Sequence, residues 1–131
     1  MIYRNKFVVI NFDTNSQIAY IKWSESTLFM SDDEYIKIAQ NIVKYIKKYK
    51  IKKILNDLTN FKTVLSLRFQ HWAKKYFFPE LNKPIKKIAI ILPTDYTVVL
   101  SIKQLLEIIK INSIEIKLFD NEINATKWLN K

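Results

Sequence analysis

The sequence contains no glycine and no cysteine, and its only histidine is His71. Without glycine, the phosphate-binding loops of Walker A proteins and of dinucleotide-binding domains are excluded. Without cysteine, there is no disulfide, no thiol nucleophile and no thiolate metal site. We expect His71 on the water-facing side of a helix, which leaves neither a catalytic triad nor a histidine-based metal site. The sequence therefore predicts no enzyme and no cofactor.

Long apolar runs are also missing. No run approaches the ~20 residues of a membrane span, and the polar start Met1-Ile2-Tyr3-Arg4-Asn5-Lys6 does not resemble a signal peptide. A length of 131 residues suits one domain over 1–131. We expect a single-domain cytoplasmic protein without membrane insertion.

Charge of one sign dominates, with a formal net charge of +10. A basic chain can bind phosphates. Here, however, nearly all the cations are lysines, and only Arg4 and Arg68 offer the bidentate geometry typical of specific recognition. The lysines are spread from Lys6 to Lys131, so we expect a diffusely basic surface and no nucleic-acid partner.

The chain begins with a hairpin pattern. Residues 7–12 and 18–23 are short runs typical of β-strands, and the polar residues 13–16 between them favour a turn. Ser31 and Glu34 then form a capping box, and apolar residues recur every three or four positions up to Tyr49. This spacing predicts a helix over 32–49.

Strands and helices alternate in the rest of the chain. We predict strands over 53–57, 87–92 and 114–119, a helix from Ser66 to Pro79, a helix over about 102–110 and a last helix capped by Asp120 or Asn121. The 102–110 helix is assigned from a second capping box, Ser101 with Gln104. The predicted fold is α/β in the order ββαβαβαβα. It has a five-stranded mixed sheet, whose first strand is antiparallel at one edge, and four helices.

This order resembles the STAS/SpoIIAA-like superfamily, and most closely the small stand-alone STAS-like (STAS/SEC14-type) proteins of Bacteroidetes. The features that carry the resemblance are the following: Trp23, Ser31-x-x-Glu34, Asp57, Trp72 followed by Pro79, Lys87–Pro93, and Phe119-Asp120 before Ala125-x-x-Trp128-Leu129. The resemblance implies a bacterial, non-catalytic regulatory domain. It also implies a phosphorylated serine at the start of the second helix, where this chain has Ser66. The Asp-Ser-Ser-Gly-like surroundings of that serine are missing here, so we expect Ser66 to be a helix cap.

Two apolar segments point to a binding surface. The segments 59–65 and 94–100 follow adjacent predicted parallel strands, so they lie at the same edge of the sheet, although loops there are normally polar. Asp57 ends the strand before the first segment, at the carboxyl edge where open α/β sheets bind ligands, or it accepts hydrogen bonds from the following turn. Trp23 ends a strand at this same edge. The candidate site residues are Trp23, Asp57, Phe61, Tyr96 and Val99.

Two functions fit such an edge. The first is a non-enzymatic binding or regulatory module for a protein partner, which includes a second copy of the chain. The alternative is a carrier or sensor of a small apolar, lipid-like ligand. An exposed patch favours the partner, whereas a closed apolar cavity of ~300 Å³ or more favours the ligand.

Overall fold

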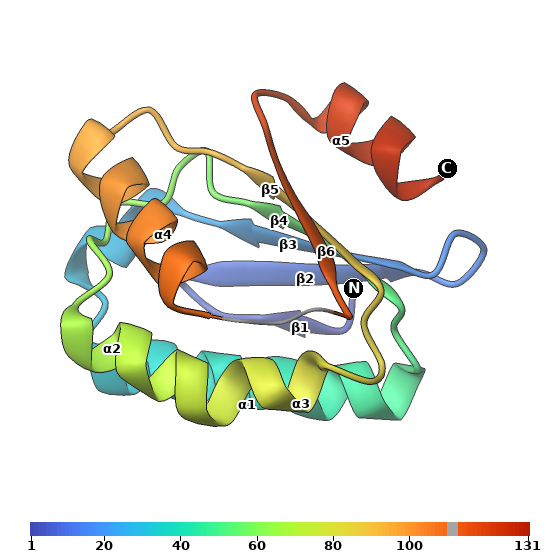
Figure 1. The fold of residues 1–131 in the computed structure, drawn as a ribbon, viewed down its shortest axis with the longest axis horizontal. Helices are drawn as coiled ribbons and strands as arrows, with labels where there is room; N and C mark the ends of the chain where they lie inside the picture. The colour runs from blue at the N-terminus through green and yellow to red at the C-terminus, as the bar shows by residue number, and fades with distance from the viewer. Residues whose placement is uncertain (110–112) are drawn as a thin grey trace.

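A computed structural model describes residues 1–109 and 113–131. One mixed sheet forms its centre, with the helices in layers on both faces (Figure 1). The strands are β1 (Tyr3–Arg4), β2 (Val8–Asp13), β3 (Ile18–Trp23), β4 (Lys53–Asp57), β5 (Lys87–Ile91) and β6 (Glu115–Phe119). The α-helices are α1 (Asp32–Tyr49), α2 (Leu67–Trp72), α3 (Phe78–Leu81), α4 (Tyr96–Ile108) and α5 (Glu122–Leu129).

The strands lie in sequential order, β1-β2-β3-β4-β5-β6. The pairs β1–β2 and β2–β3 are antiparallel, and the remaining pairs are parallel. The predicted hairpin and the mixed sheet are therefore confirmed. The predicted count of five strands is wrong, because β1 adds a sixth. Tyr3 and Arg4 pair with Ile10 and Val9, so the edge strand is β1 and β2 lies inside the sheet.

Sequential order explains where the helices lie. Each parallel crossover from β3 to β6 steps in the same direction, so α1, the α2–α3 segment and α4 cover one face of the sheet. The helix α5 follows the last strand and packs on the other face. There it buries Ala125 and Leu129 against a small cluster that contains Leu55, Ala89 and Ile91.

The segment from Leu67 to Leu81 is one helical stretch with a wide turn in its middle. A π-helical turn, η2 (Ala73–Phe77), separates α2 from α3, and the Phe78 N–H reaches back to the Ala73 carbonyl. Pro79 explains this widening, since proline has no N–H and its ring crowds the carbonyl of the preceding turn of an α-helix. With this stretch taken as one helix, the prediction of four helices is confirmed. In the described part of the chain, no helix combines the length and the apolarity that crossing a bilayer requires.

The start of α4 corrects another prediction. Asp95 caps this helix, because its carboxylate accepts hydrogen bonds from the N–H groups of Thr97 and Val98. Ser101 and Gln104 therefore lie inside the helix and form no capping box. The Ser101 hydroxyl instead donates to the Val98 carbonyl. Residues 96–100 are the first turns of α4 and not a loop, and the predicted end of the helix at Lys110 lies outside the described residues.

Candidate partner-binding surface at the carboxyl edge of the sheet

Three segments meet where the parallel strands end: the 3₁₀ helix η1 (Glu25–Phe29) after β3, the loop 58–66 after β4, and α4 after β5. Two buried hydroxyl residues hold the loop in place. The Thr27 hydroxyl accepts from the Lys62 N–H at 2.9 Å, and the Thr27 carbonyl accepts from the Thr63 hydroxyl. On the other side, the Ser101 hydroxyl accepts from the Leu65 N–H at 2.9 Å. The loop is therefore bonded to both of its neighbours.

Large apolar side chains are exposed on these bonded segments and on the start of α2. Of nine such side chains in the described residues, six lie here, and we call them the rim patch: Leu28, Phe29, Val64, Leu67, Tyr96 and Leu100. Phe29 and Tyr96 are the most exposed of the six, at 82% and 72%. Exposed apolar residues are ordinary when they are scattered singly, but their concentration on adjoining segments is typical of an interaction surface.

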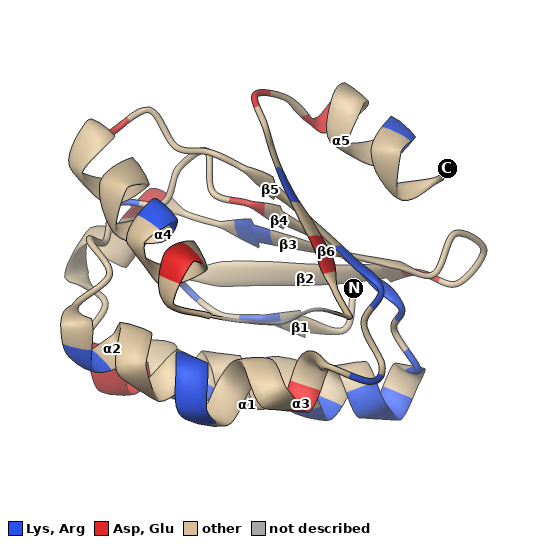
Figure 2. Cartoon of the chain, viewed as in Figure 1, with Lys and Arg blue, Asp and Glu red and all other residues tan. Residues whose placement is uncertain are grey.

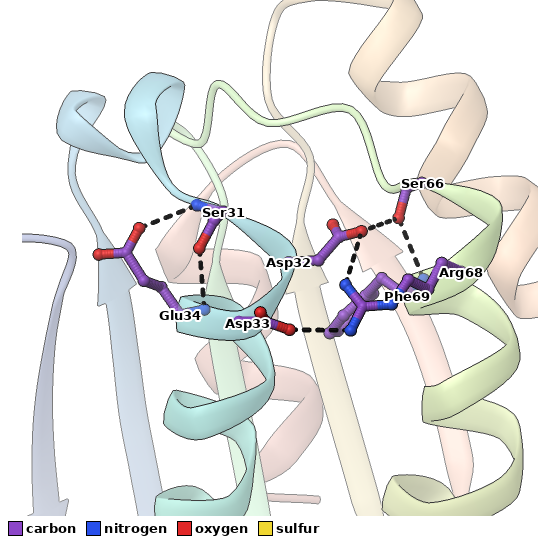
Figure 3. Close-up of polar contacts among 7 residues, drawn as sticks. All are labelled: Ser31, Asp32, Asp33, Glu34, Ser66, Arg68 and Phe69. Carbon is purple, nitrogen blue, oxygen red and sulfur yellow. Dashed lines mark hydrogen bonds and ion pairs between the residues drawn. The ribbon is translucent and has the colours of Figure 1, made fainter.

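A polar cluster joins the starts of α1 and α2 beside the rim patch (Figure 3). The Ser66 hydroxyl accepts from the Phe69 N–H at 3.0 Å and donates to Asp32 Oδ2 at 2.8 Å. Arg68 Nη2 donates to Asp33 Oδ1 at 2.8 Å, and this hydrogen bond is the main cause of the raised pKa of Arg68. Ser66 is thus the N-cap of α2, as expected, and its hydroxyl is already engaged on both sides.

The predicted capping box of α1 is confirmed (Figure 3). The Glu34 N–H donates to the Ser31 hydroxyl at 3.1 Å, and the Ser31 N–H donates to Glu34 Oε1 at 3.0 Å. The hydrogen bond from the Ser31 backbone lowers the pKa of Glu34, because it favours the carboxylate. Acidic residues at the start of α1 also interact favourably with the helix dipole.

A small apolar cavity lies between the sheet and the helices beneath this surface. Its volume is about 90 Å³, and four aromatic residues of its lining are Trp23, Tyr35, Phe61 and Phe69. Tyr35 stacks on Phe69 with ring centres 3.9 Å apart, and Trp23 meets Phe61 edge-on at 5.4 Å. Burial raises the pKa of Tyr35, so its hydroxyl stays protonated. The cavity is well below the ~300 Å³ of a typical small-molecule site.

The structure brings together two of the five candidate residues. Trp23 and Phe61 both line the cavity, and the Trp23 Nε1–H donates to Asn56 Oδ1 at 2.7 Å. Asp57 points to the opposite face of the sheet, because side chains alternate along β4 and its neighbour Asn56 faces the cavity. There its carboxylate accepts from the Thr59 N–H at 3.0 Å, the turn-stabilising role considered above.

The other two candidates lie on α4. Tyr96 is exposed in the first turn, and Val99 is half-buried; neither lines the cavity. The expectation that these five residues form one site at the carboxyl edge is therefore wrong. The prediction took residues 94–100 as a loop over the strand ends. Residues 96–100 instead belong to α4, and a helix sets the direction of each side chain.

Leu28 and Phe29 were missed as candidates. They lie in η1, between the predicted strand that ends at Trp23 and the capping box at Ser31, where no helix or strand was predicted. The signal was available, since Leu28, Phe29 and Met30 are three apolar residues in a row before the Ser31 cap. Only Met30 of the three is buried, so one apolar residue was enough to anchor the helix start and two remained on the surface.

Within residues 1–109 and 113–131, no group of three histidine, aspartate or glutamate side chains is arranged to hold a metal ion. His71 is exposed on α2, at the water-facing position expected for it. Comparison with protein-family models, with curated proteins and with solved structures finds no match.

Proposed function

We propose that the chain is a non-catalytic binding or regulatory module that holds a protein partner against the rim patch. The exposure of Phe29 and Tyr96, on adjoining segments that carry four further exposed apolar side chains, supports this proposal. Aromatic residues are the anchors that most often dominate the binding energy of protein interfaces. The resemblance to STAS/SpoIIAA-like regulatory domains supports the same proposal.

The surface beneath these anchors supports binding in a second way. Thr27 and Ser101 hold the loop 58–66 by hydrogen bonds to its backbone, so the segments that carry the rim patch are linked before a partner arrives. A pre-organised surface loses less conformational entropy on binding than a loose one. The partner expected here offers an apolar segment, and a second copy of the chain meets that description through its own rim patch.

Photo-crosslinking tests the location of the partner. A benzoylphenylalanine placed at Phe29 or at Tyr96 replaces one exposed aromatic residue with another, so the fold is retained. Both positions should crosslink the same protein in native cells. Ile123 is the matched control, because it is an exposed apolar residue on α5, on the other face of the sheet. Equal crosslinking from Ile123, or none from either rim position, would contradict the proposal.

The alternative function is a carrier of a small apolar ligand in the cavity. The apolar lining favours such a ligand, but about 90 Å³ is too little for a lipid-like molecule unless the helices move away from the sheet. Native mass spectrometry separates the two functions. We expect the mass of the bare chain or of its dimer, and a co-purified apolar molecule would favour the carrier.

A further inference from the structure

Ten of the twenty lysines gather at one end of the molecule, although they are dispersed in the sequence. Figure 2 shows them around the end of α1 and the starts of β4 and β5, which is the edge opposite the rim patch. The end of α5 reaches the same place, because Lys87 Nζ donates to the Trp128 carbonyl at 3.1 Å. We call this set the lysine end: Lys47, Lys48, Lys50, Lys52, Lys53, Lys83, Lys86, Lys87, Lys127 and Lys131.

Helix polarity explains part of this set. Lys47 and Lys48 lie in the last turn of α1, and Lys127 lies in the last turn of α5, where the helix dipole favours cations. The helices that connect parallel strands all end at the same edge of the sheet. Individual preferences at helix ends therefore add up to a basic surface.

Helix polarity explains only one of the four lysines at the strand starts, Lys87, whose Nζ donates to the Trp128 carbonyl at the end of α5. Lys53 and Lys87 are direct partners in the parallel register of β4 and β5, and the preceding residues, Lys52 and Lys86, are joined by a backbone hydrogen bond of 2.8 Å. Like charges opposite each other on neighbouring strands destabilise a sheet. Lys87 has a structural role, because its Nζ donates to the Trp128 carbonyl, but in the described residues the Lys52, Lys53 and Lys86 side chains have no ion pair or hydrogen bond that offsets the repulsion. Charges kept together at a cost in stability are typical of residues that serve an interaction.

Carboxylates do little to neutralise the lysine end. Among the described residues, Lys47 is the only one of its lysines with an ion pair, to Glu80 at 2.8 Å. The other acids at this edge are Asp13 at the β2–β3 turn, Glu107 in the last turn of α4 and Glu115 at the start of β6. Most acids lie at the opposite edge, in the turns and helix starts that follow the strands: Glu25, Asp32, Asp33, Glu34, Asp57, Asp95, Asp120 and Glu122.

We propose that the lysine end docks reversibly on an anionic lipid bilayer, by charge attraction and without insertion. Lysine is a point charge on a flexible stem, and it suits a diffuse surface potential better than the fixed geometry of a phosphodiester or a base. The large exposed apolar residues of the described chain lie mainly at the other edge, in the rim patch, so nothing at the lysine end favours burial in the hydrocarbon.

Two observations favour a bilayer over a nucleic acid. The lysines lie at strand starts and helix ends on one edge of the sheet, and eight of the ten are exposed, so they offer a broad charged surface. In addition, the two aromatic rings beside them are covered: Lys48 Nζ lies 5.3 Å from the Tyr49 ring centre, and Lys87 Nζ lies 5.0 Å from that of Trp128. Stacking of single-stranded bases needs free ring faces. End-on docking leaves the rim patch facing away from the membrane, so a protein partner and the bilayer can be bound at the same time.

Vesicle sedimentation tests the proposal. The chain should bind vesicles of phosphatidylcholine with about 30% phosphatidylserine at about 0.1 M salt, and it should not bind pure phosphatidylcholine. The exposed lysines Lys48, Lys52, Lys83 and Lys86 are changed to glutamine together. Because each lysine near an anionic surface contributes separately to binding, the partition coefficient should fall by about a hundredfold or more.

A charge-matched variant provides the control. Lys37, Lys74, Lys75 and Lys103 are also exposed but lie away from the lysine end, and changing these four to glutamine lowers the net charge by the same amount. This control should bind within about threefold of the unmodified chain.

Equal losses in both variants would overturn the proposal, as would failure of the unmodified chain to bind. Binding of duplex DNA or RNA at about 0.15 M salt without binding of vesicles would overturn it in favour of a nucleic acid. Melting curves should show both variants folded, because all eight side chains are exposed.

Discussion

The two edges of the parallel sheet differ in almost every surface property. The carboxyl edge carries the rim patch, the acidic helix starts and a loop bonded to both neighbours. The amino edge carries lysines on strand starts and helix ends, with only a few acids among them. Both edges are built by the same βαβ units, so the difference arises because every unit has the same direction. Features at helix starts collect at one edge, and features at helix ends collect at the other.

The largest expected effect is a loss of stability in the buried part of the carboxyl edge, which we compare with its exposed part. Phe61 is almost completely buried between Trp23 and Tyr35, whereas Val64 is exposed three residues later in the same loop. Phe61→Ala should lower the free energy of unfolding by about 3–5 kcal/mol, because it leaves a cavity. Val64→Ala should lower it by less than about 0.5 kcal/mol. Urea unfolding measures both, and similar losses would mean that the loop is part of the core throughout.

An intermediate effect is expected at the polar cluster of the carboxyl edge. Ser66→Ala removes both the cap of α2 and the hydrogen bond to Asp32. Loss of an N-cap typically costs about 0.5–2 kcal/mol, and urea unfolding should show a loss in that range. Ser66→Asp is the informative comparison, because aspartate caps helices equally well but would face Asp32 at close range. It should therefore recover less stability than capping alone predicts, and full recovery would show that the contact with Asp32 contributes nothing.

The smallest effect concerns the amino edge and has the opposite sign. Lys53→Gln removes one of two like charges in register, so it should raise the free energy of unfolding by about 0.2–1 kcal/mol. The gain should shrink in about 1 M salt, where charges are screened within ~3 Å. Lys74→Gln, on the exposed side of η2, should change stability little in either buffer. A loss of stability in Lys53→Gln would remove the argument that this edge is maintained for binding.

The sequence predicted the elements best where the local signals were strong. The capping box at Ser31, the N-cap at Ser66 and the buried run of β5 each depend on neighbouring residues, and each lies where it was expected. At α4 two local signals competed, Asp95 and Ser101. The spacing of apolar residues does not decide between the two helix starts, since residues 96–100 are mostly apolar and show no single apolar face. Packing does, because it buries Val98 and brings the Ser101 hydroxyl to the Leu65 N–H.

The sequence alone determined the α/β alternation, the hairpin at the start and the absence of glycine- and cysteine-dependent sites. These follow from local periodicity, caps and composition, which do not depend on distant residues. Only the tertiary structure decided that Asp57 and Asn56 face opposite sides of β4, that Phe29 and Tyr96 stay exposed at one edge, and that dispersed lysines form one basic end. These facts depend on strand order and on the shared direction of the βαβ units, which bring together residues far apart in the chain.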